Sequence, residues 1–90
     1  MYTVKTTNRF DKDVKLCKKR GFDMELLKKA IKILEEKGML PPSYKPHKLS
    51  GNYAGFWEAH IKGDWLLVWQ IHEEELTLIL TNTGTHSDLF

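Results

Sequence analysis

The amino-acid sequence predicts an α+β fold, with elements in the order strand, helix, helix and then three or four strands. Two observations carry this prediction. The first half of the chain holds two amphipathic helical patterns, and the second half holds apolar segments of strand length separated by turn residues. A chain of 90 residues, 41% hydrophobic and 29% charged, suits a small folded core, so we expect residues 1–90 to form a single domain.

A short strand and two helices are predicted in the first half. Residues 2–6 alternate in polarity and are rich in β-forming residues. Each helix that follows carries apolar residues at helical spacing between a polar capping residue and a glycine. These residues are Thr7 or Asn8, Phe10, Val14, Cys17 and Gly21 in the first helix, and Asp23, Leu27, Ala30, Ile31, Leu34 and Gly38 in the second. Neither helix can bury its apolar stripe alone, so the pair needs a sheet to cover it.

The second half is predicted to be a series of strands joined by hairpins. Residues 41–46 contain three prolines and form a loop, because proline cannot continue the second helix. The predicted strands are residues 55–61, 65–71 and 76–83, with turns at residues 62–64 and 72–75. Alternation in the first of them places Phe56, Glu58 and His60 on one face. The second is a nearly continuous apolar run, as expected of a central strand.

Charge is divided unevenly along the chain. Residues 1–48 contain thirteen of the fourteen basic residues but only six of the twelve acidic ones. A basic half is the usual electrostatic footprint of a polyanionic partner. Lysine-rich clusters such as Lys18-Lys19-Arg20 also fit plain solvated helix faces, so charge alone leaves both interpretations open.

Two further features bear on the compartment. The single cysteine, Cys17, cannot form an internal disulfide and is interpreted as a packing thiol rather than a reactive nucleophile, in a reducing setting. No apolar segment reaches the length of about 18 residues that a bilayer requires. The N-terminus also lacks the apolar core of a signal peptide. We therefore expect a cytoplasmic protein without a membrane partner.

Three segments of the second half carry most of the side chains suited to chemistry. They are Pro46-His47-Lys48-Leu49-Ser50-Gly51, Ala59-His60-Ile61-Lys62-Gly63-Asp64-Trp65 and Asn82-Thr83-Gly84-Thr85-His86-Ser87-Asp88-Leu89-Phe90. Their order resembles the YafQ branch of the RelE-like toxins of bacterial type II toxin–antitoxin systems. The resemblance covers nearly the whole chain, and its specific part is residues 46–90.

The resemblance implies a fold, an activity and a set of partners. The fold is a mainly antiparallel sheet of four to five strands, with both helices on one face and the first strand at or near one edge. The activity is ribosome-dependent cleavage of mRNA in the A site, without metal or cofactor. The partners are a cognate antitoxin, which suits the lysine-rich hairpin of residues 9–37, and the 70S ribosome with its mRNA. Ribosomal RNA would contact the basic helices, and operator DNA only the antitoxin.

Metal-free RNA cleavage needs a base for the ribose 2′-OH, a donor for the phosphorane and an acid for the departing 5′-oxygen, and imidazole suits either proton role. Carried over from the resemblance, the catalytic positions are His47, His60, Asp64 and His86, and the substrate-binding positions are Trp65, Asn82 and Phe90, with Lys48 and Lys62 as further cations. We expect His60 and His86 to form the acid–base pair, in an order that the sequence leaves open. Asp64 is expected to orient a histidine or the 2′-OH and to favour imidazolium. His47 is expected to donate to the scissile phosphate, and Phe90 to stack on a nucleobase.

One position departs from the YafQ pattern. An arginine often precedes the Thr-Gly-Thr-His stretch in that family, whereas this chain has Asn82. An amide brings no charge, so stabilisation of the phosphate would rest on imidazolium, Lys48 or Lys62. The departure leaves open a second hypothesis, a catalytically weak or inactive RelE-like module that acts through an antitoxin-like partner. A ribosome-independent RNase is a third.

Several of these residues also fit structural roles. The three histidines of the quoted segments are 13 and 26 residues apart, which matches no compact ligand motif, so no metal site is expected. The three tryptophans fit the core of the sheet, and Trp65 alone lies at a turn where an exposed stacking role is feasible. Glu58 is expected either to pair with His60 or to lie in solvent, and Asp88 to be solvated.

Overall fold

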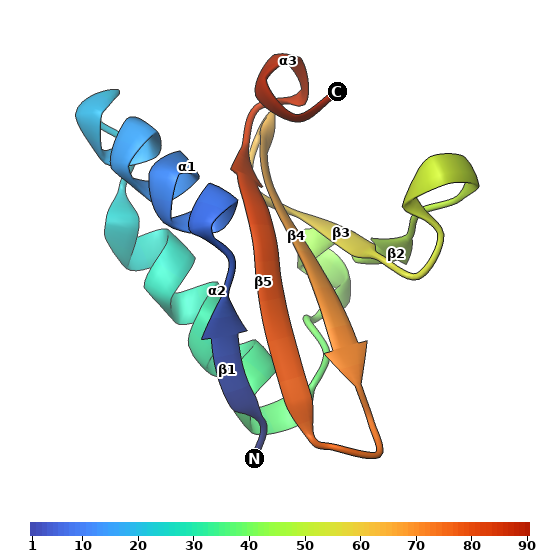
Figure 1. Ribbon diagram of the computed structural model, residues 1–90. Coiled ribbons are helices and arrows are strands. Elements are labelled where there is room, and N and C mark those ends of the chain that lie inside the picture. The colour runs from blue at the N-terminus through green and yellow to red at the C-terminus, as the bar shows by residue number, and fades with distance from the viewer.

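The computed structural model describes all 90 residues and contains one five-stranded sheet and two long helices (Figure 1). The elements are β1 (Thr3–Thr6), α1 (Asn8–Lys19), α2 (Met24–Lys37), β2 (His47–Lys48), β3 (Trp57–Lys62), β4 (Trp65–His72), β5 (Thr77–Gly84) and α3 (His86–Leu89), with 3-10 turns at Pro42–Tyr44 and Gly51–Tyr53. The predicted α+β class and the order of the main elements are confirmed. Two short elements, β2 and α3, were not predicted as a strand and a helix.

The strands lie in the order β1-β5-β4-β3-β2. β1 pairs with β5 in parallel, and all other neighbours are antiparallel, as expected of a mainly antiparallel sheet with the first strand at one edge. β4 is the middle strand, and its first five residues, 65–69, are all buried. The continuous apolar run predicted for a central strand therefore lies where it was expected.

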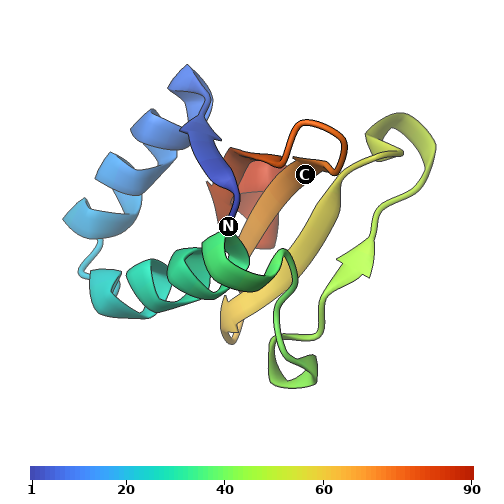
Figure 2. The same ribbon diagram turned by 90° about the horizontal axis from the view of Figure 1, so that it is seen from below.

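Both long helices cover the same face of the sheet, as the view from below shows (Figure 2). Thr7 caps α1 by accepting a hydrogen bond from the backbone N–H of Phe10, and Asp23 caps α2 in the same way through Glu25. α2 ends at Gly38, whose positive φ of 72° closes the helix in the left-handed conformation. None of the helices is long and apolar enough to cross a membrane.

The hydrophobic core lies between these helices and the sheet. Its buried members are Phe10, Cys17, Leu27, Ala30, Leu34, Leu40, Ala59, Trp65, Leu67, Trp69, Leu78 and Leu80. Cys17 is 1% exposed, and its burial raises the pKa of the thiol, which disfavours the reactive thiolate. The predicted role of Cys17 as a packing thiol agrees with this environment.

Alternation along β3 places its core residues on one face of the sheet and its candidate-site residues on the other. Trp57, Ala59 and Ile61 pack against the hydrophobic core beneath the helices. Glu58 and His60 therefore project to the opposite face of the sheet, which the long helices leave uncovered. This face carries the residues of the candidate site.

Candidate active site

The candidate site lies at one end of the sheet, where the turn between β3 and β4 meets α3. Antiparallel pairing of β4 with β5 places Gly84 opposite Leu66, so the chain leaves β5 close to the start of β4. α3 follows at once and lies over this end of the sheet (Figure 1). Asp64 from the turn and His86 from the first residue of α3 are thereby brought into contact.

His86 and Asp64 form a close pair. The Nδ1 atom of His86 lies 2.5 Å from the Oδ1 atom of Asp64, and the His86 backbone N–H points to the same oxygen at 3.4 Å. This hydrogen bond raises the pKa of His86 above its ordinary value of 6.5, and it lowers the pKa of Asp64. The pair therefore favours an imidazolium at His86 near neutral pH, with Nε2 as the nitrogen left for substrate.

His60 lies beside His86 in a different hydrogen-bonding environment. The two ring centroids are 6.4 Å apart, and the Nδ1 atom of His60 lies 3.0 Å from the carbonyl oxygen of Gly63. A carbonyl oxygen can only accept, so Nδ1 of His60 carries the hydrogen. In the neutral ring Nε2 is then left with a free lone pair, which is the form that a general base requires.

His47 lies on the edge strand, one strand away from His60. It lies within β2, which precedes β3, the strand predicted at residues 55–61, and it faces Glu58 across the β2–β3 pair. Its Nδ1 atom lies 3.0 Å from the carbonyl oxygen of Lys45, and its Nε2 atom lies 3.3 Å from Oε1 of Glu58. Both neighbours accept hydrogen bonds, so each ring nitrogen of His47 faces an acceptor.

Glu58 differs from both predicted alternatives. It is 4% exposed, so it does not lie in solvent, and its ion-pair partner is His47 rather than His60. The alternation of β3 correctly placed Glu58 and His60 on one face. Their separate partners depend on the two-residue strand β2, which is too short to show a pattern in the sequence.

An exposed aromatic surface adjoins His86. The ring centroid of Phe90 lies 6.2 Å from that of His86, and Tyr53 meets Phe90 edge-on at 5.1 Å. Phe90 is 54% exposed and Tyr53 is 44% exposed. Tyr53 was not among the predicted site residues, because nothing in its sequence neighbourhood indicates that the 3-10 turn Gly51–Tyr53 meets the other end of the chain.

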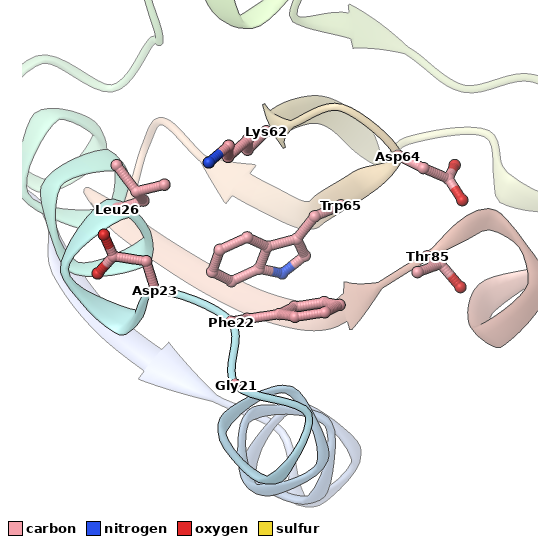
Figure 3. A pocket seen from close by; sticks show the side chains of 8 residues that line it. All are labelled: Gly21, Phe22, Asp23, Leu26, Lys62, Asp64, Trp65 and Thr85. Carbon is pink, nitrogen blue, oxygen red and sulfur yellow. The ribbon is translucent and has the colours of Figure 1, made fainter.

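Trp65 lies in the core, as all three tryptophans were expected to, and does not take the exposed stacking role that its turn left feasible. It is 5% exposed, and its indole N–H donates a hydrogen bond of 2.9 Å to the hydroxyl of Thr83. Its ring is packed against Phe22, with the centroids 5.0 Å apart. Figure 3 shows Trp65 at the centre of a pocket of about 440 Å³, with the Lys62 side chain extending above the indole. The tryptophan therefore supports the turn that carries Asp64 instead of offering a free stacking face.

The remaining predicted substrate-binding residues contact structural neighbours. The side-chain amide of Asn82 lies 3.4 Å from Oδ2 of Asp13 on α1, and the ammonium group of Lys48 lies 5.6 Å from the ring centroid of Trp57. Lys62 lines the same pocket as Trp65. The structure thus gathers His60, Asp64, His86 and Phe90 at one end of the sheet, places His47 one strand away, and joins neither Asn82 nor Lys48 to the histidines by a hydrogen bond.

Two aspartates have roles that the sequence analysis did not assign. Asp13 is 8% exposed, pairs with Arg9 and accepts a hydrogen bond of 3.2 Å from the backbone N–H of Thr83. Asp88, expected to be solvated, instead accepts two hydrogen bonds from Arg20 and closes a capping box with Thr85. The spacing Thr-x-x-Asp is a helix-start signal, so this short helix was detectable from the sequence.

No group of three or more histidine, cysteine, aspartate or glutamate side chains is arranged in this structure to hold a metal ion. Glu58 holds one histidine and Asp64 another, so the acidic side chains of the site are each committed to a separate imidazole. The arrangement offers proton transfer and cationic hydrogen-bond donors.

The chain is similar to a group of bacterial toxins. It is matched over residues 2–90 by the family described as bacterial toxin of type II toxin-antitoxin system, YafQ. The mRNA interferase toxin YafQ of Escherichia coli K12 is 36% identical over 88 residues, which cover 97% of this chain and 94% of the relative. A metal-bound toxin from Helicobacter pylori is 47% identical, with a TM-score of 0.90 and full coverage of both chains. A chain of the E. coli DinJ-YafQ complex is 35% identical with a TM-score of 0.90, covering 100% of this chain and 99% of that one.

Proposed function

The chain belongs to the YafQ family of bacterial type II toxin–antitoxin systems, and from this premise we propose that it is a ribosome-dependent mRNA endoribonuclease that inhibits translation. One observation supports the chemistry most directly. Two imidazoles lie side by side, one facing a carbonyl oxygen at His60 and the other facing a carboxylate at His86. Asp64 raises the pKa of His86, which suits a general acid, and the carbonyl oxygen at Nδ1 of His60 leaves its Nε2 atom facing away from that partner, which suits a base.

His60 is the general base in this proposal. With Nδ1–H held by the carbonyl of Gly63, its Nε2 lone pair accepts the proton of the ribose 2′-OH. The 2′-oxygen then forms a bond to the adjacent phosphorus. The product on this side of the cut is a 2′,3′-cyclic phosphate.

His86 is the general acid. The pKa of its ring is raised mainly by the hydrogen bond to Asp64, so the imidazolium is available near neutral pH. It transfers the Nε2 proton to the 5′-oxygen as the phosphorus–oxygen bond breaks, which leaves a 5′-hydroxyl on the second product. Asp64 stabilises the charge on the ring before transfer and fixes its orientation.

In this proposal His47 interacts with the scissile phosphate. The carbonyl oxygen of Lys45 and the buried carboxylate of Glu58 lie 3.0 Å and 3.3 Å from its two ring nitrogens. The protonated form of the ring would stabilise the extra negative charge of the pentavalent phosphorus. This role supports activity in a chain that has Asn82 where an arginine is common, because the charge then comes from imidazolium.

The aromatic surface of Phe90 and Tyr53 is proposed to hold a nucleobase. Stacking of a base on an aromatic ring contributes about 1–3 kcal/mol and tolerates any base. Phe90 adjoins His86 and is more than half exposed, so a base stacked on it would lie next to the scissile bond. Substrate binding would thus place the phosphate between the two histidines.

The basic helices are proposed to bind ribosomal RNA and the antitoxin at overlapping surfaces. An apolar groove of about 530 Å³ between α1 and α2 is lined by residues that include Val14, Met24 and Ile31, together with Lys15, Lys18 and Lys28. Apolar side chains beside lysines suit an amphipathic, acidic segment of an antitoxin. The same lysines suit RNA phosphates. Occupation by the antitoxin would therefore block ribosome binding, with both events taking place in the cytoplasm and operator DNA contacted only by the antitoxin.

Cleavage of mRNA on programmed ribosomes tests the function. We expect wild-type protein to cut ribosome-bound mRNA and to leave naked RNA intact. His86→Ala should reduce the rate by about 10²- to 10⁴-fold, which is the usual contribution of a general acid. His72→Ala is the matched control, because His72 is also exposed but lies at the far end of β4.

A second function is suggested by Asn82, because β5 has an amide here where the family often has an arginine, and this amide contacts Asp13 on α1. In that alternative the chain is an inactive module that binds an antitoxin-like partner. Folded wild-type protein that binds ribosomes or antitoxin without cutting mRNA would establish the alternative. Cutting of naked RNA would instead indicate a ribosome-independent RNase.

A further inference from the structure

α3 is the element that carries His86 to the site, and it is only four residues long. A helix of this length has no stability of its own, because nucleation costs more than its few hydrogen bonds return. Its position must therefore be imposed by contacts outside its own backbone. Asp88 is the residue at which those contacts converge.

Asp88 holds α3 internally through a capping box. The Thr85 backbone N–H donates to Oδ2 of Asp88 at 2.9 Å, and the Asp88 backbone N–H donates to the Thr85 hydroxyl at 3.3 Å. These two bonds fix the first turn directly around His86. Gly84 adds a steric limit, because a Cβ atom built there would lie 2.9 Å from Oδ2 of Asp88.

Arg20 holds the same carboxylate from the end of α1. Its Nη1 atom donates to Oδ2 of Asp88 at 2.6 Å, and its Nη2 atom donates to Oδ1 at 3.1 Å. A planar guanidinium that meets both carboxylate oxygens fixes orientation as well as distance. Arg9 adds a bond of 3.2 Å from its guanidinium to the carbonyl oxygen of Asp88. Arg9 within α1 and Arg20 at its C-terminal end therefore both donate hydrogen bonds to Asp88.

The carboxylate of Asp88 stays charged throughout the pH range in which histidines titrate. Its pKa lies far below the usual range, chiefly because of the hydrogen bond from Arg20 and then the backbone bond from Thr85. The contact is also partly shielded, with the Arg20 and Asp88 side chains 39% and 20% exposed. The ion pair between Arg20 and Asp88 therefore persists while His86 gains or loses its proton.

We propose that Arg20 is a positioning residue that fixes the general acid His86 by holding Asp88, and thereby the whole of α3, against α1. The proposal rests on the proposed ribonuclease function only for its activity readout. Arg20 makes no contact with His86 or Asp64, so it acts through the placement of α3. Without it, the capping box would remain but the helix would lose its fixed position relative to Asp64.

Measurement of kcat and KM on ribosomes distinguishes a positioning role of Arg20 from a direct contact with RNA phosphate. Arg20 follows Lys18 and Lys19 in sequence, so its charge could equally serve RNA binding. Lys19→Gln is the matched control, because it removes one charge from the same exposed helix end without touching α3. We expect Arg20→Gln to lower kcat about 10- to 100-fold, as small misplacements of catalytic groups do, with KM no higher than in Lys19→Gln. Arg20→Lys should recover only part of kcat, since lysine keeps the charge but loses the two-pronged bond.

NMR titration of His86 tests the same proposal in the free protein, whether or not it cuts RNA. In Arg20→Gln the pKa of His86 should fall toward the ordinary value, because α3 no longer keeps the ring against Asp64. Lys19→Gln should leave it unchanged. Thermal unfolding of each variant shows whether the fold is intact. The double variant Arg20→Gln with Asp88→Asn should have the same kcat as Asp88→Asn alone, because Arg20 acts through Asp88.

Two results would overturn the proposal. One is an unchanged His86 pKa in folded Arg20→Gln. The other is a rise in KM with normal kcat that matches Lys19→Gln, which would make Arg20 an RNA contact. A third result separates the two proposals. If the pKa of His86 is lower in Arg20→Gln than in wild type but wild type does not cut mRNA, the positioning role of Arg20 is supported and the ribonuclease function is not.

Discussion

Glu58 and His47 face each other across the β2–β3 pair, with Oε1 of the carboxylate 3.3 Å from Nε2 of the imidazole. The two partners differ sharply in exposure, since the Glu58 side chain is 6% exposed and the His47 side chain 50%. An exposed ring thus supplies the ion-pair partner of a buried carboxylate. The charge of Glu58 also contributes to raising the pKa of His86, so one acid influences two of the three site histidines.

Removal of His47 should destabilise the protein more than its exposure implies. In His47→Ala the buried carboxylate of Glu58 loses its partner, at a cost of about 1–3 kcal/mol in the free energy of unfolding. Urea denaturation at pH 7 measures this, with His72→Ala as a control that should change little. Adding Glu58→Gln to His47→Ala should restore part of the stability. Equal unfolding midpoints for the two histidine variants would contradict the prediction.

Loss of the Asp64 carboxylate should shift the pH dependence of cleavage. Asp64 raises the pKa of His86, so the acid stays protonated to higher pH in the wild type. In Asp64→Asn the basic limb of the kcat profile should therefore move to lower pH. Glu74→Gln, an exposed change in the β4–β5 turn, is the control. A basic limb that does not move would exclude His86 as the titrating acid.

The pair of His86 and Asp64 should stabilise the folded protein only within a defined pH range. The pKa of His86 is raised and that of Asp64 is lowered on folding. The contribution is therefore lost as pH rises through the folded pKa of His86, and also as pH falls through the folded pKa of Asp64. Chemical denaturation across this range should show a smaller pH dependence in Asp64→Asn than in wild type.

An alanine at Gly84 should displace α3. Gly84 has a φ of 154°, and a Cβ atom would approach Asp88 within 3.0 Å at two atoms. Strain of this kind costs about 1–3 kcal/mol, and we expect cleavage to fall with it. Gly21→Ala is the control, because its φ of 83° is also unfavourable for alanine but nothing lies within 4 Å. If both variants lose stability but retain equal activity, α3 does not set the geometry of the site.

Truncation of Phe90 should weaken substrate binding rather than folding. Phe90 is 54% exposed, and a stacked base contributes about 1–3 kcal/mol, so Phe90→Ala should raise KM roughly tenfold or more. Met39→Ala, which removes a 43% exposed apolar side chain elsewhere, should leave KM unchanged. Steady-state cleavage on programmed ribosomes measures both. A fall in kcat at unchanged KM would place Phe90 in the support of His86 instead.

Local signals in the sequence were sufficient for most of the scaffold. The caps at Thr7 and Asp23 and the stop at Gly38 were predictable, because each depends on side chains within a few residues. The central position of β4 followed from its continuous apolar run. Parallel pairing of β1 with β5 could not be derived in this way, since it depends on contacts between the two ends of the sequence.

The site was less predictable than the scaffold, because its partners come from distant segments. The sequence left Trp65 either in the core or exposed at a turn, and the choice depends on Phe22 from the α1–α2 connection, which packs against it. Asp88 was expected in solvent, yet Arg20 binds it across 68 residues. The meeting of His60 with His86 was a hypothesis of the resemblance, and no pattern within either segment predicts a separation of 6.4 Å.

The parallel pairing of β1 with β5 also affects when the site of a newly made chain is assembled during folding. Strand pairings between distant parts of a chain form slowly in folding, whereas the contacts of a helical hairpin are local and form early. His86 cannot meet Asp64 until β5 has taken its place in the sheet. We therefore expect a period in folding in which α1 and α2 are already present but His86 and Asp64 have not yet met. A protein that recognises those helices has this interval in which to capture the molecule before it can act.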